Sequence, residues 1–159
     1  MEDDFDTFVS SRIDYCNIIL AGVSGQLLQR LQSVQNAAAR LVTGAWRSDR
    51  MTPILRQLHW LPVRQRITFK TAVLVYKCRH GMAPPYLSTY CEPTSSHGGR
   101  CHLRSAESGQ LTDPPTRTNY GDRNFAVHRP VVWNSLPADL RLLNISLPVF
   151  RKRLKMFLF

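Results

Sequence analysis

The acidic residues near the start of the chain are the first group whose chemistry has to be considered. Glu2, Asp3, Asp4 and Asp6 form the densest carboxylate cluster in the sequence. Converging carboxylates are what two-metal phosphoryl transfer requires. No helix or strand pattern precedes this cluster, so nothing would hold the carboxylates in a fixed geometry. We therefore interpret the cluster as solvated charge and expect no catalytic residue in it.

A second group contains residue types that bind zinc, namely Cys91, His97, Cys101 and His102. Their spacing, Cys-x5-His-x3-Cys-His, is not a usual ligand pattern, and the adjacent Cys101 and His102 would be awkward in one tetrahedron. A structural zinc, as in the zinc knuckles that bind nucleic acid, is the minor alternative. We therefore expect no metal and no other cofactor.

Sequence motifs of common enzymes are missing. The chain has no glycine-rich phosphate loop, no Cys-x-x-Cys pair, no Gly-x-Ser-x-Gly elbow and no His-Glu-x-x-His helix. We therefore expect a protein that is not an enzyme.

The four cysteines are irregularly spaced, which indicates reduced thiols. No apolar run approaches the ~20 residues of a membrane span, and the acidic N-terminus does not look like a signal peptide. These features favour an intracellular protein of the nucleus or cytoplasm, without a membrane segment.

The distribution of charge is the strongest functional signal in the sequence. The chain has 21 Lys and Arg against 11 Asp and Glu, a formal net charge of +10. Residues 1–39 carry two bases and five acids, net −3, whereas residues 40–80 carry nine bases against Asp49 alone, net +8. Such asymmetry favours a polyanionic partner, nucleic acid first and an anionic membrane surface second.

The candidate phosphate-binding residues fall in two clusters. The proposed nucleic-acid contacts are Arg64, Arg66, Lys70 and Lys77, followed by Arg151, Lys152, Arg153 and Lys155. Each cluster has a structural alternative, because both could be solvated helix faces and basic residues also suit the negative end of a helix dipole. The basic run 151–155 is a weak match to a nuclear address.

Helical periodicity predicts the elements that must position these residues. A helix is expected from Thr7 to Leu20, ended by Gly22, and another from Ser24 as N-cap to Gly44 as terminator. Apolar residues of the second helix alternate steps of four and three, which predicts a one-faced amphipathic helix. The face consists of Leu27, Leu31, Val34, Ala38 and Leu41, with Gln29, Gln32, Asn36 and Arg40 on the opposite side.

Two proline-initiated helices follow. Thr52-Pro53 is expected to start a short one, and Pro62 a longer one that runs to Gly81. In the longer helix apolar residues cover nearly the whole circumference except for a narrow edge formed by Arg66, Lys70 and Lys77. We expect this to be the central helix, with its cationic edge at a surface or groove.

The remainder of the chain is harder to assign. Residues 91–119 are predicted to form a flexible polar loop with one short strand near Leu103. Residues 124–133 are predicted to be an extended or edge β segment because Pro130 interrupts a β-compatible run. Ser146 should cap a last helix, and Trp60 and Trp133, each close to a Leu-Pro pair, are expected in the core.

These predictions define the expected fold class. The chain should be mainly α, a small helical bundle of about four to five helices with a long polar loop and a short extended segment before the C-terminal helix. We divide it into an unmatched, disordered N-terminus (1–7), a helical subdomain (8–90), the polar loop (91–119) and an extended segment plus C-terminal helix (120–159).

Several unusual sequence words occur in an order that resembles a known family. The words are SRIDYCNIILAG (11–22), LQSVQNAAARLVTG (31–44), LHWLPVRQRI (58–67), HGMAPPYL (80–87), YGDRNF (120–125), WNSLP (133–137) and the last helix (150–159). Together they resemble the region downstream of the reverse-transcriptase domain in non-LTR, LINE-type retrotransposon polyproteins of the jockey and chicken-repeat groups. The resemblance covers nearly the whole chain apart from residues 1–7.

The resemblance implies the C-terminal part of an RNA-directed DNA polymerase that helps to hold RNA template or target DNA. The endonuclease, fingers and palm have no counterpart here, so the catalytic residues of the family have no positions to be carried onto. The leading hypothesis is a non-catalytic fragment that binds RNA or DNA backbone through a basic helical surface. The alternative is a protein-docking or structural fragment, or an inert relic, whose apolar faces lack their polymerase partner. The third hypothesis is a stand-alone nuclease or polymerase that uses Asp3 and Asp4.

Overall fold

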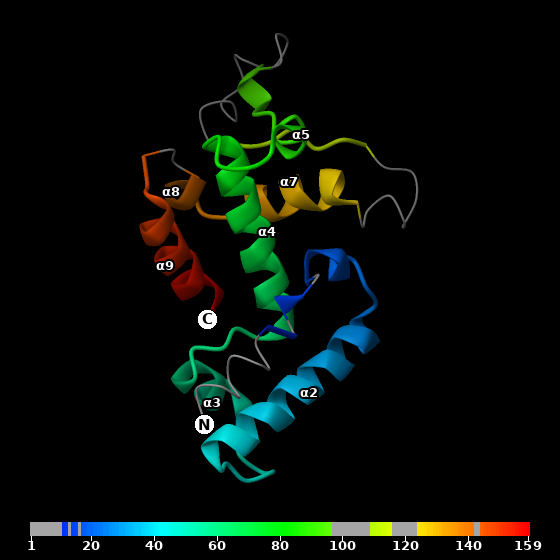
Figure 1. Ribbon diagram of the computed structural model, residues 1–159, viewed down its shortest axis with the longest axis vertical. Coiled ribbons are helices and arrows are strands. Elements are labelled where there is room, and N and C mark those ends of the chain that lie inside the picture. The colour runs from blue at the N-terminus through cyan, green and yellow to red at the C-terminus, as the bar shows by residue number, and fades with distance from the viewer. Residues whose placement is uncertain (1–10, 13, 16, 97–108, 116–123, 142–143) are drawn as a thin grey trace.

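Helix α4 (Val63–Arg79) runs through the middle of the molecule, and the other helices are arranged around it (Figure 1). The computed structural model describes residues 11–12, 14–15, 17–96, 109–115, 124–141 and 144–159. The remaining described elements are η1 (Asn17–Leu20), α2 (Gly25–Thr43), α3 (Met51–Gln57), α5 (Pro85–Ser88), η2 (Thr94–Ser96), α7 (Phe125–Ser135), α8 (Ala138–Arg141) and α9 (Leu147–Leu158). This confirms the prediction of a mainly helical bundle.

The main core forms where α4 meets α7 and α9. The three largest fully buried side chains, Trp133, Tyr76 and Phe150, come from these three helices. The Phe150 ring lies 4.5 Å from the Tyr76 ring and 6.0 Å from the Trp133 ring, centroid to centroid. The Tyr76 hydroxyl donates a hydrogen bond to the Ile145 carbonyl, so its polar end is satisfied. Burial of Trp60, 5% exposed, and of Trp133, 1% exposed, confirms that both are core residues.

Helix α7 corrects the prediction of an extended segment at residues 124–133. Asn124 acts as the N-cap, because its side chain accepts a hydrogen bond from the Ala126 N–H. Pro130 stands inside the helix, 1% exposed or less, and Trp133 and Val132 pack on the α4 core. The prediction of an extended segment was wrong because it relied on the rule that a proline disfavours the interior of a helix. Burial of a large aromatic residue outweighs one missing hydrogen bond, which costs about 3 kcal/mol.

Helix α2 has the predicted ends but a different buried face. Ser24 is at the N-cap position without a side-chain hydrogen bond, and Gly44 ends the helix at φ 67° in the left-handed conformation. The residues that the structure buries are Gln35, Ala38 and Ala39. Three members of the predicted apolar face are exposed instead, namely Leu27 (50%), Val34 (61%) and Leu41 (77%). Of the other two members, Ala38 is buried and Leu31 packs against Ala21, Val63 and Ile67, so the fold covers only one edge of the predicted apolar face.

Two glutamines explain this orientation of α2. The Gln35 side chain donates a 2.9 Å hydrogen bond to the Leu61 carbonyl, and the Gln32 side chain accepts a 2.9 Å bond from the Val63 N–H. The Val63 N–H belongs to the first turn of α4, where backbone donors have no partner within the helix. The glutamines thus satisfy buried backbone groups, and small alanines allow a close approach to Trp60 and α3.

The described parts of the loop predicted for residues 91–119 are hydrogen-bonded to one another and to α7. Pro93 and Leu111 form an isolated antiparallel bridge, and the Asn134 side chain bonds both the N–H and the carbonyl of Leu111, at 2.9 and 3.0 Å. Leu111 is 2% exposed, so the loop closes on the core. The strand predicted near Leu103 lies outside the described residues.

Smaller differences concern the ends of other helices. Helix α3 begins at Met51 with Arg50 at its N-cap, slightly before the predicted Thr52. Helix α9 follows Ser146, as predicted, although the serine makes no side-chain cap bond. Only part of the predicted helix Thr7–Leu20 is described, and there the 3-10 turn η1 precedes Gly22, whose φ is 72°.

Candidate functional site

A small hollow brings together cationic residues from two helices that are far apart in the sequence. Its volume is about 200 Å³. Arg66 and Lys70 come from α4 and Lys155 comes from α9, which packs against α4. The other lining residues are Asp14, His59, Leu61 and Phe69. Three of the eight predicted nucleic-acid contacts therefore meet at one place.

Asp14 is the centre of the charge arrangement. Its Oδ1 lies 3.0 Å from Arg66 Nη1 and its Oδ2 lies 3.0 Å from Lys70 Nζ. Arg66 and Lys70 are one helical turn apart on α4, so a single carboxylate can bridge them. The Arg66 side chain is only 10% exposed, whereas that of Lys70 is 40% exposed. Along the predicted cationic edge of α4, Arg66 is therefore mostly buried in an ion pair within the hollow, whereas Lys70 is more exposed.

Lys155 completes the hollow from the side of α9. Burial lowers the pKa of Lys155, and repulsion by the nearby Arg66 lowers it further. The residues that line the hollow thus include three cations and one carboxylate. The local field favours an added anion, because it would relieve this repulsion.

His59, one of the residues that line the hollow, has an unusual backbone conformation. Its φ is 56°, the one positive φ among the described non-glycine residues. The Trp60 N–H reaches back to the Leu55 carbonyl at 2.8 Å, so His59 ends α3 in the position where glycine is common. A histidine in the left-handed region costs roughly 1–2 kcal/mol, and such strain is frequent at functional sites.

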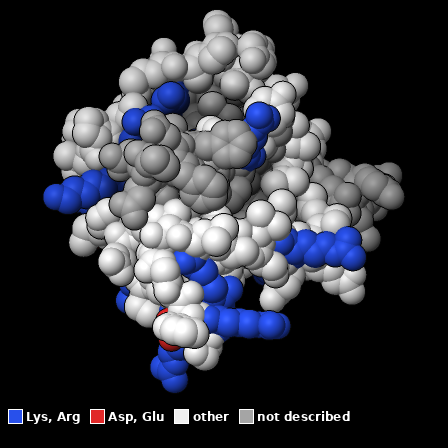
Figure 2. All heavy atoms as spheres, turned by 60° about the horizontal axis from the view of Figure 1, so that its bottom comes forward, with Lys and Arg blue, Asp and Glu red and all other residues white. Residues whose placement is uncertain are grey.

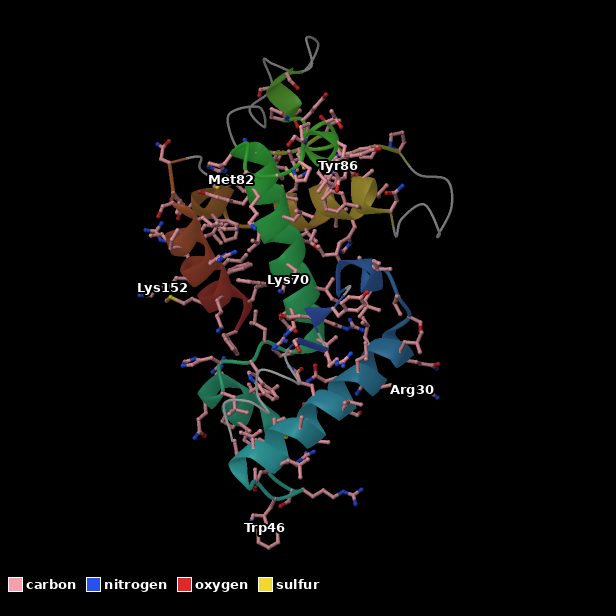
Figure 3. All side chains as sticks on the ribbon, viewed as in Figure 1. Arg30, Trp46, Lys70, Met82, Tyr86 and Lys152 are labelled. Atoms are coloured by element: carbon pink, nitrogen blue, oxygen red, sulfur yellow. The ribbon has the colours of Figure 1, made fainter. Side chains whose placement is uncertain are left out.

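The other predicted contacts do not join this hollow. Arg64 lines a separate shallow hollow with Arg30 of α2, and Lys77 lies three turns further along α4. Arg151 and Lys152 are exposed on α9, and Lys152 and Arg30 lie on opposite sides of the molecule (Figure 3). Figure 2 shows Lys and Arg side chains projecting at several points around one face, with little acidic surface between them.

Sequence reasoning missed a second group of cations, at the C-terminal end of α4. Arg79 Nη1 donates to the Gly109 carbonyl at 3.0 Å, and its guanidinium lies 5.3 Å from the Trp133 ring centroid. Arg129 is 6% and Arg141 9% exposed, and the Nε and Nη1 of each have no hydrogen-bond partner among the residues that the structure describes. Burial lowers the pKa of Arg79 and of Arg129. The signal available in the sequence was an arginine beside Pro130 in an otherwise apolar run.

Two thiols lie against this second group. Cys78 and Cys91 are both free and buried, and their side chains are in hydrogen-bond contact. Burial raises the pKa of Cys78 to about 12, and burial also raises that of Cys91. His97, Cys101 and His102, the other members of the zinc group considered above, lie outside the described residues, as do Asp3 and Asp4.

Two further findings concern the described part of the chain. There, no three His, Cys, Asp or Glu residues are placed together so that they could hold a metal ion. None of its helices combines the length and the apolar character that crossing a membrane requires.

Comparisons with known proteins add no relative. No protein-family model, no curated protein and no solved structure matches the chain. Its own residues and the sequence words given above are therefore the basis for a function.

Proposed function

We propose that this chain is a non-catalytic module that binds the backbone of RNA or DNA, from the C-terminal region of a LINE-type reverse transcriptase. The observation that carries the proposal is the convergence of Arg66, Lys70 and Lys155 on one hollow from α4 and α9. The net charge of +10 supports it, because excess positive charge attracts polyanions irrespective of sequence.

The hollow suggests how a phosphate group is bound. Asp14 holds Arg66 and Lys70 in place before the ligand arrives, which reduces the entropic cost of binding. Lys70 is the more exposed of the two and is free to exchange its carboxylate partner for a phosphate oxygen. Arg151 precedes Lys155 by one turn on α9 and extends the cationic surface beyond the hollow.

The proposed origin rests on the order of the sequence words. The words at 11–22, 58–67 and 150–159 include Asp14, Arg66 and Lys155 of the hollow. In the parent polyprotein the polymerase domain would catalyse the reaction, and this chain would bind the RNA template or the target DNA. That division of roles fits a basic hollow lined by cations and a single carboxylate.

Binding across a salt series tests this proposal. Labelled duplex DNA and single-stranded RNA are titrated with the full chain from 50 to 300 mM salt. We expect micromolar or tighter binding that weakens log-linearly with salt, with a slope of about −0.9 for each DNA phosphate contacted. A folded, soluble chain that does not bind either polymer would contradict the proposal.

Charge-matched variants locate the site. Lys70→Gln with Lys155→Gln removes two cations from the hollow, and Arg47→Gln with Arg50→Gln removes two exposed cations near α3 as the control. The hollow variant should reduce the slope for duplex DNA by about 2 and the control by less than 1. Equal losses would show that binding depends on net charge and not on the hollow.

His59→Gly separates a binding role of His59 from a purely structural one. Glycine adopts the positive φ without strain, so stability should be unchanged or higher by up to about 1 kcal/mol. If His59 contacts phosphate, affinity falls while stability does not. Unchanged affinity would restrict His59 to its role as the end of α3.

A second candidate function, protein docking, is favoured by one observation. Trp46 is 80% exposed and Leu41 is 77% exposed, together with Val34 and Leu27 along α2. Exposed apolar residues that gather along one helix are typical of an interaction surface. Gel filtration of the full chain distinguishes the two candidates, because a docking fragment is expected to self-associate or aggregate irrespective of nucleic acid.

A further inference from the structure

Trp46 is the most exposed large apolar side chain in the part of the chain that the structure describes, at 80%. It projects beyond the end of α2, away from the other helices (Figure 3). The other two tryptophans, Trp60 and Trp133, are 5% and 1% exposed and belong to the core. A single exposed apolar residue is ordinary, so the surroundings of the Trp46 ring decide what it can bind.

Hydrogen bonds fix the turn that carries Trp46. The Trp46 N–H donates to Asp49 Oδ2 at 2.8 Å, and the Asp49 N–H donates to the Trp46 carbonyl at 3.1 Å. Arg40 Nη2 of α2 donates to the Arg47 carbonyl at 3.5 Å, which ties the helix to the far side of the turn. The backbone of Trp46 is therefore held in place, so less conformational freedom is lost when a ligand covers its ring.

The surroundings of the ring are cationic. Residues 40–50 contain the three bases Arg40, Arg47 and Arg50 against Asp49 alone, a net charge of +2. The Asp49 carboxylate accepts the Trp46 N–H, so it is turned toward the backbone of the turn. Arg47 and Arg50 are exposed, and no ion pair between described residues involves either of them. This charge favours an anionic partner beside the ring.

A hollow of about 700 Å³ adjoins the ring. Trp46 and Arg50 line it together with the polar residues Thr43 and Gln57, and Leu58 adds apolar surface. The volume lies within the range of sites that bind small organic groups. An aromatic ring, a guanidinium and hydrogen-bonding side chains beside apolar surface are the features with which proteins hold an unpaired base.

We propose that Trp46 stacks on an unpaired base of single-stranded nucleic acid, and that Arg47 and Arg50 contact the phosphates next to that base. This proposal rests on the proposed function and adds to it a preference for unpaired bases at the end of α2. The cationic hollow between α4 and α9 needs phosphates alone, whereas the Trp46 site needs a free base face. Stacking tolerates any sequence, because every base has a π-face.

Duplex DNA does not use the Trp46 site. Its bases are stacked on one another, so the ring finds no free face to cover. Without a stacked base, the neighbouring phosphates are not brought to Arg47 and Arg50. These two arginines therefore remain a suitable control for duplex binding, and their contribution is confined to single strands.

Two single-stranded probes of equal length test the proposal with the full chain. Oligothymidylate and an abasic oligodeoxynucleotide carry the same phosphates, and only the first has base rings. We expect the chain to bind oligothymidylate about tenfold more tightly than the abasic strand. Trp46→Ala should abolish this difference and leave the salt slope unchanged, because stacking releases no counterions. Its affinity for duplex DNA should stay within about twofold of the parent chain.

Two further variants serve as controls for the ring. Trp46→Phe keeps an aromatic ring and should retain the affinity for oligothymidylate within about threefold. Leu41→Ala removes an apolar side chain of similar exposure, 77%, and should change neither affinity by more than about twofold. Circular dichroism and thermal unfolding establish that all three variants fold.

Tryptophan fluorescence gives a second measurement that reports on the ring itself. Trp60 and Trp133 are buried, so acrylamide quenches chiefly the emission of Trp46. Oligothymidylate should protect this emission from acrylamide, and the abasic strand and duplex DNA should not.

The failure of this proposal is distinguishable from that of the proposed function. Equal affinity for the two single-stranded probes, or a base preference that survives Trp46→Ala, would overturn the Trp46 site and leave phosphate binding intact. Self-association that Trp46→Ala abolishes, without a base preference, would assign the ring to a protein interface and overturn the proposal. Absence of binding to every probe, duplex DNA included, would contradict the proposed function and the Trp46 site with it.

Discussion

The two halves of the helical bundle use their side chains in opposite ways. Around α4, α7 and α9 the largest residues, Trp133, Tyr76 and Phe150, are fully buried. Along α2 the large apolar residues Leu27, Val34 and Leu41 face outward, and the helix buries two alanines and Gln35. The buried aromatic residues around α4 therefore stabilise the fold. Helix α2 is attached through small residues and hydrogen bonds, and it leaves apolar surface available for association.

Truncating the centre of the α4 core should have the largest effect. Phe150→Ala removes a 0% exposed ring that stacks on Tyr76 and packs near Trp133. We expect it to lower the free energy of unfolding by about 3–5 kcal/mol. Urea unfolding followed by circular dichroism measures the loss. A loss below about 1 kcal/mol would contradict the assignment of this cluster as the main core.

Thiol reactivity tests how tightly the same core is closed. In a Cys16→Ser, Cys101→Ser background, Cys78 and Cys91 should react with a disulfide reagent at least about a hundredfold more slowly than in urea. The reactive form is the thiolate, and burial raises the pKa of Cys78 to about 12, so the rate should still be rising with pH above pH 9. Rapid reaction at pH 7 in the folded chain would show that this end of α4 opens easily.

Gln35 tests the polar attachment of α2. Gln35→Leu has a similar volume but leaves the Leu61 carbonyl without its donor, which should cost about 1–3 kcal/mol. Gln29→Leu changes an exposed position of the same helix and serves as the control, with an expected change within about 0.5 kcal/mol. If both variants unfold at the same urea concentration, the buried amide is not what orients α2.

Asp14 tests the ion pairs that join the segment before η1 to α4. Asp14→Asn leaves Arg66 buried without its carboxylate and should cost about 1–2 kcal/mol, less than a fully buried pair because the Asp14 side chain is 30% exposed. The hollow also becomes more positive, so DNA affinity at low salt should rise. Thermal unfolding and the salt titration measure the two effects in one variant. A decrease in affinity with retained folding would indicate that Asp14 positions Lys70 and does not compete with phosphate.

The smallest effect on stability is expected at the exposed apolar residues of α2. Leu41→Ala removes a side chain that is 77% exposed, so the free energy of unfolding should change by less than about 0.5 kcal/mol. Urea unfolding of this variant beside Phe150→Ala compares the two halves of the bundle directly. A loss of about 2 kcal/mol or more would mean that the Leu41 side chain is packed within the folded chain.

The sequence predicted part of the candidate site. Arg66, Lys70 and Lys155 were identified as candidate phosphate contacts on two separate helices, because a narrow basic edge on an apolar helix is visible in a helical wheel. Their meeting in one hollow was not predicted, and Asp14 and His59 were not recognised as members. Asp14 is 52 residues from Arg66, and periodicity carries no information about contacts over such a separation.

Local chemistry determined what could be read from the sequence alone. Gly44 ends α2 because it adopts a positive φ, Pro62 precedes the first turn of α4, and Trp60 and Trp133 are buried because their large apolar surfaces are costly to hydrate. These outcomes depend on a few neighbouring residues or on the residue type itself.

The tertiary structure decided the rest. Residues 125–135 are helical despite Pro130, because burial of Trp133 against α4 outweighs the missing hydrogen bond. Helix α2 turns Gln32 and Gln35 inward and leaves Leu27 and Leu41 exposed, because backbone groups at the start of α4 need partners that leucine does not provide. In both cases a long-range contact overrides a local preference, since local preferences differ by only a few kcal/mol and a buried contact contributes as much.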